Sequence, residues 1–156
     1  MPVTRIARLR PADLHQLETL LRAHHLPTED CAQQPQIFYG IYDGEQLVAA
    51  GGLEPAGEYA LLRSVVVSQD YRARGLGRSI TEYLLQRAES EGRAAIYLLT
   101  ESAEDYFAAR GFERVAREQV PEAVRRTRQF ASLCPDSASC MRMTLPRRGS
   151  FRDTDP

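Results

Sequence analysis

Residues 72–79 combine arginines and glycines in a way that suits a bound phosphate group. Gly75 and Gly77 carry no side chain, so phosphate oxygens can approach the backbone N–H groups. A hydrophobic strand is expected before this stretch, at 61–67, and an amphipathic helix after it, from Leu76 to about Glu91. The first N–H groups of a helix lack helical partners, and the helix dipole adds partial positive charge there. The order strand, basic glycine turn, helix therefore predicts a pyrophosphate site.

Two better-known phosphate motifs do not match this stretch. A P-loop needs a Lys-Ser/Thr pair after its last glycine, and the sequence contains no lysine. The Rossmann fingerprint needs three glycines near the start of a βαβ unit. The alternative for a short glycine turn is an ordinary loop, but its place between strand and helix favours the phosphate site. The residues expected to form the site are Arg72, Ala73, Arg74, Gly75, Leu76, Gly77, Arg78 and Ser79.

Composition indicates one globular domain. The 156 residues are 43% apolar and 26% charged, which predicts a domain at 1–146 with a core of its own and a flexible polar tail at 147–156. The net charge of −1 argues against nucleic acid and anionic membranes as partners. No apolar run approaches the roughly 18 residues of a membrane span, and the N-terminus lacks a signal peptide's apolar region. Three cysteines suggest reduced thiols and a cytoplasmic location.

Hydrophobic periodicity predicts an α/β domain. Antiparallel hairpins come first and strand-helix-strand units follow, which gives a mixed sheet of about seven strands with four to five helices. A turn is expected at 54–58, where Pro55 and Gly57 lie. Strands are expected at 4–9, 37–42, 46–53, 59–67, 94–99, 112–115 and 139–145. Helices are expected from Pro11 to about His24, briefly near 28–30, and at 76–91, 102–110 and 121–130.

The spacing Arg-x-x-Gly-x-Gly after a valine-rich strand resembles the acetyl-CoA loop of the GNAT superfamily of N-acetyltransferases. The element order extends this resemblance over nearly the whole chain. Residues 100–112 resemble the second GNAT signature: Ala103 and Gly111-Phe112 match, whereas Thr100 replaces the usual Asn and Phe107 replaces the usual Tyr. The resemblance implies a GNAT fold with a splayed parallel strand pair and acetyl-CoA as cosubstrate.

The same resemblance implies how the cosubstrate would be held. The backbone of Val65, Val66 and Val67 would bind the pantetheine arm in the wedge between the strands at 61–67 and 94–99, with Thr100 and Phe107 nearby. A backbone N–H near Val65 or Val66 would stabilise the oxyanion. The same valines also suit a plain core strand, and the two interpretations are compatible.

The proton-transfer groups depart from the family pattern. The usual acid is the Tyr that Phe107 replaces, and Tyr106 is displaced by about 100° on a helix. Ser102 is the substitute that we predict, with water as the alternative. The usual glutamate base is replaced by Leu61, so Glu54, or else Glu58, is expected to relay the proton through water. The alternative for both glutamates is a solvated turn carboxylate.

Arginines suggest the acceptor. Arg63 interrupts an apolar strand, and a buried charge must be paired or face a cavity. It either binds a substrate carboxylate or pairs with an internal acid such as Glu54 or Glu101. Residues 106–112 and 120–123, followed by an arginine-rich helix, resemble the acetyltransferase domain of N-acetylglutamate synthases. They resemble small acetyltransferases of arsenic-resistance operons even more, especially at 128–135. Arginines bind carboxylates bidentately, and Arg128 is the preferred ligand there; the alternative is that the helix arginines are solvated or contact the cosubstrate's phosphates.

The leading hypothesis is an N-acetyltransferase that acts on a small acidic amino acid or on an amino-acid-like arsenic or phosphorus analogue, with direct attack of the amine on the thioester. Relatives are commonly dimers, and nothing in the sequence excludes a homodimer. The alternative is a non-catalytic acyl-CoA sensor, or a trivalent-arsenic-binding protein that uses Cys31, Cys134 and Cys140. A peptide N-terminus or polyamine is a third acceptor class. No metal site is predicted.

Overall fold

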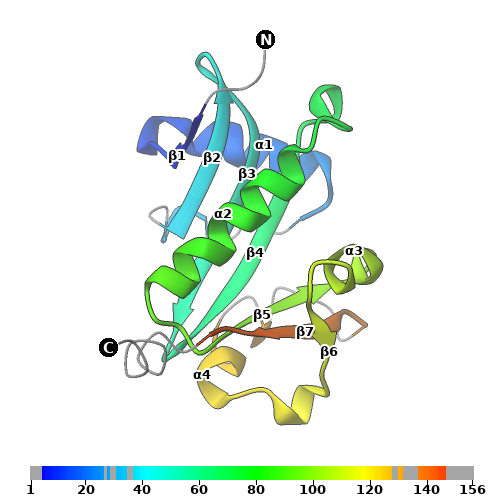
Figure 1. Cartoon of the computed structure of the whole chain (residues 1–156). Coiled ribbons are helices and arrows are strands. Elements are labelled where there is room, and N and C mark those ends of the chain that lie inside the picture. The colour runs from blue at the N-terminus through cyan, green and yellow to red at the C-terminus, as the bar shows by residue number, and fades with distance from the viewer. Residues whose placement is uncertain are drawn as a thin grey trace, which may run out of the picture. The chain divides into compact units, whose positions relative to one another are not determined.

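The computed structural model describes residues 5–26, 28, 31–34, 37–127, 130–131 and 137–146. Within them, seven strands form a mixed sheet with the order β1-β2-β3-β4-β5-β7-β6, and four α-helices accompany it (Figure 1). The strands are β1 (Arg5–Arg8), β2 (Phe38–Asp43), β3 (Gln46–Ala56), β4 (Tyr59–Val67), β5 (Ala95–Thr100), β6 (Glu113–Arg114) and β7 (Ser139–Thr144). The α-helices are α1 (Leu14–Ala23), α2 (Leu76–Ser90), α3 (Glu104–Ala108) and α4 (Glu122–Arg125). The predicted α/β class and the predicted number of strands are confirmed.

The chain divides into two compact units. Unit 1 comprises residues 1–53 and 64–84, and unit 2 comprises 54–63 and 85–156. The boundaries fall inside β3, β4 and α2, so each of these elements contributes residues to both units. The predicted phosphate loop belongs to unit 1.

Unit 1 is built around α1 and the hairpin of β2 and β3. Leu17 and Leu21 recur at helical spacing and are fully buried, in a cluster with Phe38 and Val66. The first part of α2 lies so close to β3 that a Cβ on Gly51 would meet Leu84 Cδ1 at 2.9 Å. A side chain at position 51 would therefore require the end of the Leu84 side chain to shift.

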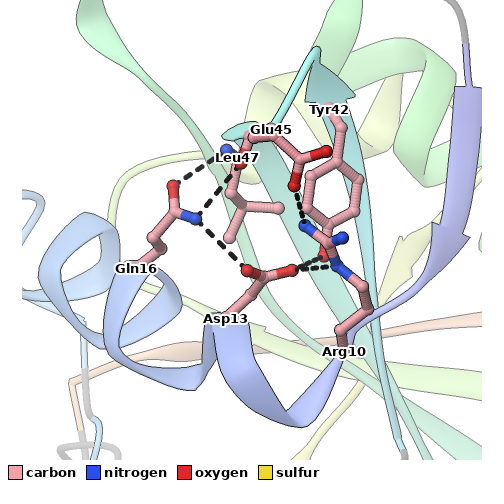
Figure 2. A network of polar contacts seen from close by, with 6 residues as sticks. All are labelled: Arg10, Asp13, Gln16, Tyr42, Glu45 and Leu47. Carbon is pink, nitrogen blue, oxygen red and sulfur yellow. Dashed lines mark hydrogen bonds and ion pairs between the residues drawn. The ribbon is translucent and has the colours of Figure 1, made fainter.

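A buried carboxylate joins the start of α1 to that hairpin (Figure 2). Asp13 accepts hydrogen bonds from Arg10 Nε at 2.7 Å and from the Tyr42 hydroxyl at 2.8 Å. Gln16 donates to Asp13 at 3.3 Å and accepts from the Leu47 backbone N–H at 3.0 Å, beside the bulge in the pairing of β2 with β3. Gln16 therefore ties the start of α1 to β3 next to the bulge.

This network predicts acid sensitivity. Burial alone would raise the pKa of the Asp13 carboxyl, but hydrogen bonds from Arg10, Tyr42 and Gln16 outweigh it, and the pKa is lowered. Asp13 therefore contributes stability that is present above its unfolded pKa of about 3.9 and is lost as the pH falls through the folded value. We expect Asp13→Asn to lower the free energy of unfolding by about 1–3 kcal/mol at neutral pH. When urea unfolding is measured at decreasing pH, the variant should lose less stability towards acid than the wild type does. Glu45→Gln, at the exposed end of the network, is the control. An equal loss of stability towards acid in the wild type and in Asp13→Asn would contradict the prediction.

Unit 2 contains β5, β6, β7, the first part of β4 and a second core. β5 pairs with β7 in antiparallel register from Ala95↔Thr144 to Thr100↔Ser139, and β6 pairs with β7 at the edge. The start of β4 pairs with β5 in parallel at Ala60↔Ile96 and Leu61↔Tyr97. The fully buried Leu61 and Val124 lie in this core. The predicted parallel strand pair is confirmed.

Two predicted elements need correction. Glu54 is not in a turn, because β3 continues to Ala56 and the turn shrinks to Gly57, whose φ is +63°, and Glu58. The helix expected at 121–130 is only α4 over its first turn, and Thr127 Oγ1 donates to the Val124 carbonyl just after it, at 2.7 Å. The short helix expected near 28–30 falls partly outside the described residues, as the tail at 147–156 does wholly. Within the described part of the chain, no helix combines the length and apolar character that a membrane crossing needs.

Candidate functional site

The predicted phosphate loop is an exposed turn that ends in the first turn of α2. Residues 72–75 are all exposed, and α2 begins at Leu76. Ala73 and Gly75 adopt left-handed φ values of +66° and +77°, and a Cβ at Gly75 would meet no atom within 4 Å. Ser79 N–H donates to the Gly75 carbonyl at 3.0 Å, so the N–H groups ahead of it stand at the helix start. Sequence therefore located a loop with room for an anion at a helix N-terminus.

The basic side chains of the loop differ in the partners that they contact. Arg78 Nε donates to Glu82 at 3.1 Å in an exposed pair one helical turn long. Arg74 stacks on the ring of Tyr71, with its guanidinium carbon 4.8 Å from the ring centroid. Tyr71 lies in a short 3₁₀ turn, Gln69–Tyr71, that directly precedes the loop. Tyr71 was not among the predicted site residues.

β4 changes its backbone conformation just before the three predicted valines. Ser64 has a φ of +59°, a left-handed value that costs a non-glycine residue about 1–2 kcal/mol. After it, Val66 is buried in unit 1 while Val65 and Val67 are half-buried. The pairs of β4 with β5 lie before it, at Ala60 and Leu61. Strain of this kind clusters at functional sites, but sequence gave no signal for it because the residue is a serine and not a glycine.

Arg63 has an internal partner. Its Nη1 donates to Glu54 Oε1 at 3.2 Å, and the side chains of Arg63 and Glu54 are 1% and 10% exposed. The structure therefore supports the second of the two interpretations of Arg63, pairing with an internal acid. It also removes Glu54 from the class of solvated turn carboxylates, while Glu58 and Glu101 are exposed.

The predicted residues around the start of α3 differ in their exposure and in their contacts. Thr100 Oγ1 accepts the Ala103 N–H at 2.9 Å and so caps the turn before α3. Ser102 is exposed and precedes the helix, which starts at Glu104. Phe107 is buried, with its ring against Phe112, whereas Tyr106 is 36% exposed. The two side chains differ in exposure, yet their rings lie edge to face with centroids 5.1 Å apart.

The remaining predicted residues lie in the cores of the two units or outside the described residues. Leu61 is fully buried in the core of unit 2. Cys31 is buried in unit 1 and Cys140 in unit 2, where burial raises the pKa of Cys140 to about 11 and keeps it a neutral thiol. Among the described residues no group of three or more His, Cys, Asp or Glu side chains could hold a metal ion. Cys134 and Arg128 lie outside the described residues.

Comparison with solved structures shows the same fold in acetyltransferases. N-acetylglutamate synthase from Neisseria gonorrhoeae, complexed with coenzyme A and N-acetyl-glutamate, superposes with a TM-score of 0.80 at 17% identity over 92% of this chain. This chain covers only 35% of that synthase. Rv2747 from Mycobacterium tuberculosis, in complex with CoA and NLQ, gives 0.78 at 20% identity over 92% of this chain and 100% of that one. The ribosomal-protein-S18-alanine N-acetyltransferase from Escherichia coli gives 0.70 at 19% identity over 90% of this chain and 93% of that one.

The family assignment rests on sequence as well as on shape. The profile of the acetyltransferase (GNAT) family matches residues 6–116, which span the phosphate loop, β4 and α3. Members of this family use acetyl-CoA as cosubstrate. The chain belongs to the GNAT family of acetyltransferases.

Proposed function

We propose that this protein transfers the acetyl group of acetyl-CoA to the amine of a small acidic amino acid, or of an amino-acid-like arsenic or phosphorus analogue. The observation that carries the proposal is the exposed loop at 72–79, with Gly75 held at a φ of +77° beside open space at the start of α2. A loop of this form suits a pyrophosphate, and acetyl-CoA carries one.

The cosubstrate would be held along unit 1. Backbone N–H groups at 73–78 would bind the pyrophosphate, because unpaired helix-start donors and the helix dipole both favour an anion there. The N–H groups of Arg72 and Ser79, at the two ends of the loop, already donate to the Gln69 and Gly75 carbonyls. The backbone of Val65, Val66 and Val67 would bind the pantetheine arm, since it follows the kink at Ser64. Thr100 and Phe107, which belong to unit 2, complete the set of proposed cosubstrate residues.

Acetyl-CoA supplies the thioester, and the protein's own groups handle the protons. An α-amine is mostly protonated at pH 7 and must lose a proton before its nitrogen forms the new bond to carbon. Glu54 is the proposed proton acceptor, acting through water. As the carbon–sulfur bond breaks, Ser102 or water would protonate the leaving sulfur, which is a tolerable leaving group even unprotonated near neutral pH. The exposure of Ser102 is consistent with this role.

The acceptor is proposed from arginines and from neighbours. The Neisseria synthase was crystallised with N-acetyl-glutamate, a product of the proposed class. Arg63 already has Glu54 as a partner. We therefore propose that Arg128 binds the acceptor's carboxylate, and that Arg63 binds it only where that carboxylate displaces Glu54. A role in arsenic resistance rests on the resemblance of residues 128–135, most of which lie outside the described residues.

A non-catalytic acyl-CoA sensor is the second candidate. Phe107 is buried at 8% exposure and Leu61 at 0%, and both stand where relatives carry an acid and a base. Neither side chain can exchange a proton, so this fold could bind acyl-CoA without turning it over. The sensor and the enzyme share the phosphate loop and differ in thiol release.

An acceptor panel tests the proposed function. Free thiol released from acetyl-CoA would be measured with the common amino acids, with glutamate analogues that carry phosphinate or arsenic groups, with polyamines and with short peptides. We expect turnover to be confined to acidic amino acids or their analogues. Turnover with polyamines or peptides alone would overturn the acceptor, and no turnover in a protein that binds CoA would favour the sensor.

A further inference from the structure

Tyr71 connects the phosphate loop to a distant hairpin turn. Its hydroxyl donates a hydrogen bond of 2.6 Å to Asp43 Oδ2. Asp43 is the last residue of β2, directly before the turn at Gly44, and lies 28 residues away in sequence. Both residues belong to unit 1. A hydrogen bond from a hydroxyl to a carboxylate is among the shorter and stronger kinds, so the rotation of the Tyr71 ring is fixed from outside the loop.

The ring of Tyr71 in turn supports Arg74. The guanidinium carbon lies 4.8 Å from the ring centroid, within the range of a cation–π contact. Arg74 stands between Ala73 and Gly75, whose left-handed φ values of +66° and +77° turn the chain sharply on both sides of it. The loop therefore brings an exposed arginine back over the aromatic ring that precedes it.

The base of this arrangement is tied down by the backbone. Ser68 N–H donates to the Val48 carbonyl of β3 at 2.8 Å, and Tyr71 N–H donates to the Ser68 carbonyl at 2.9 Å. The hydrogen bond to Asp43 also raises the pKa of the Tyr71 hydroxyl, so the phenol remains a donor at neutral pH. Backbone, hydroxyl and ring are thus all held before any ligand arrives.

We propose that Tyr71 is a positioning residue, oriented by Asp43, that holds Arg74 ready to bind a phosphate group of the cosubstrate. The inference rests on the proposed function, because it needs the loop to bind acetyl-CoA. Arginine loses much side-chain freedom when it binds, and a side chain that is already restrained loses less. The stack therefore favours binding without a contact of its own to the ligand.

Calorimetric titration with coenzyme A tests this without any acceptor. Tyr71→Leu removes both the ring and the hydroxyl, and we expect CoA binding to weaken about two- to fivefold, the range of an exposed cation–π contact. Tyr71→Phe keeps the ring and loses only the tie to Asp43, so its effect should be smaller. Asp43→Asn keeps an amide oxygen that can still accept from the Tyr71 hydroxyl, so its effect should be no larger than that of Tyr71→Phe. Glu45→Gln neutralises a neighbouring acid of the same turn that bonds Arg10 instead, and should leave CoA binding unchanged.

The decisive measurement is whether substitutions at Tyr71 and Arg74 have additive effects on the dissociation constant for CoA. In an Arg74→Gln background, Tyr71→Leu should have no further effect on the dissociation constant, because Tyr71 acts only through Arg74. Additive losses, or wild-type affinity in Tyr71→Leu, would overturn the inference. If Tyr71→Leu does not fold, Tyr71→Phe and Asp43→Asn carry the same cycle. Titration with dephospho-CoA identifies the phosphate: a 3′-phosphate contact predicts that the Arg74→Gln effect disappears, whereas a pyrophosphate contact predicts that it persists.

Failure of this inference is distinguishable from failure of the proposed function. If wild-type protein does not bind CoA, the proposed phosphate site itself is wrong. If wild type binds CoA and Arg74→Gln weakens binding while the Tyr71 and Asp43 variants do not, only the positioning role of Tyr71 is wrong.

Discussion

Replacing Gly75 with alanine is expected to weaken coenzyme A binding at least about tenfold, the effect of losing one hydrogen bond to a charged group. The residue has a φ of +77°, and a Cβ there would point into space with no protein atom within 4 Å. In the proposed function that space belongs to the pyrophosphate, so the added methyl group would push phosphate oxygens off the backbone donors. The left-handed conformation adds a stability cost of about 1–2 kcal/mol. Calorimetric titration and urea unfolding measure the two effects separately.

Gly92 offers a closely matched control. It has a φ of +79°, it too has no atom within 4 Å of an added Cβ, and it follows the other end of α2. Gly92→Ala should therefore lower the free energy of unfolding about as much as Gly75→Ala while leaving the affinity for CoA at the wild-type value. Equal CoA affinities in the two variants would show that Gly75 does not face the cosubstrate.

Neutralising Glu54 is expected to have the largest effect on stability. Glu54→Gln removes the negative charge of Glu54 from beside the Arg63 guanidinium, whose side chain is 1% exposed. Breaking a buried pair by removing one partner costs about 3–5 kcal/mol, and the amide's remaining ability to accept a hydrogen bond places this variant near the lower end. Urea unfolding at neutral pH measures the loss.

Two further variants give this prediction its controls. Glu82→Gln breaks the exposed pair with Arg78, whose side chains are 65% and 50% exposed, and should change the free energy of unfolding by less than about 1 kcal/mol. The double variant Glu54→Leu, Arg63→Met replaces the pair with apolar side chains and should recover most of the loss. A Glu54→Gln variant as stable as Glu82→Gln would mean that the pair contributes little to the fold.

The sequence predicted the parts of the fold that depend on local patterns. Gly75 and Gly77 between a valine strand and a helix located the exposed loop at the start of α2, and Asp43-Gly44 located the hairpin of β2 and β3. Gly92, with a φ of +79°, ended α2 where the pattern required it. In each case the backbone conformation demands a particular residue type, so the residue type reveals the conformation.

The errors and omissions arose where partners are distant or where a residue departs from its usual role. Pro55 indicated a turn, yet β3 runs through it because the start of β4 folds back alongside and buries Glu54 against Arg63. Ser64 adopts a left-handed φ that a serine rarely adopts. The bond between Tyr71 and Asp43 joins residues 28 apart, and no spacing rule in a single sequence connects them.

The most direct test of the central claim follows the acetyl group itself. Acetyl-CoA labelled with ¹³C at the acetyl carbonyl would be incubated with the protein and glutamate, and with the best acceptor of the panel, and the products would be read by mass spectrometry. The account predicts that the label appears on the amine nitrogen of an acidic amino acid or its analogue, together with an equal amount of free thiol. A label that stays on coenzyme A, in a protein shown to bind it, would contradict the account and identify an acyl-CoA sensor.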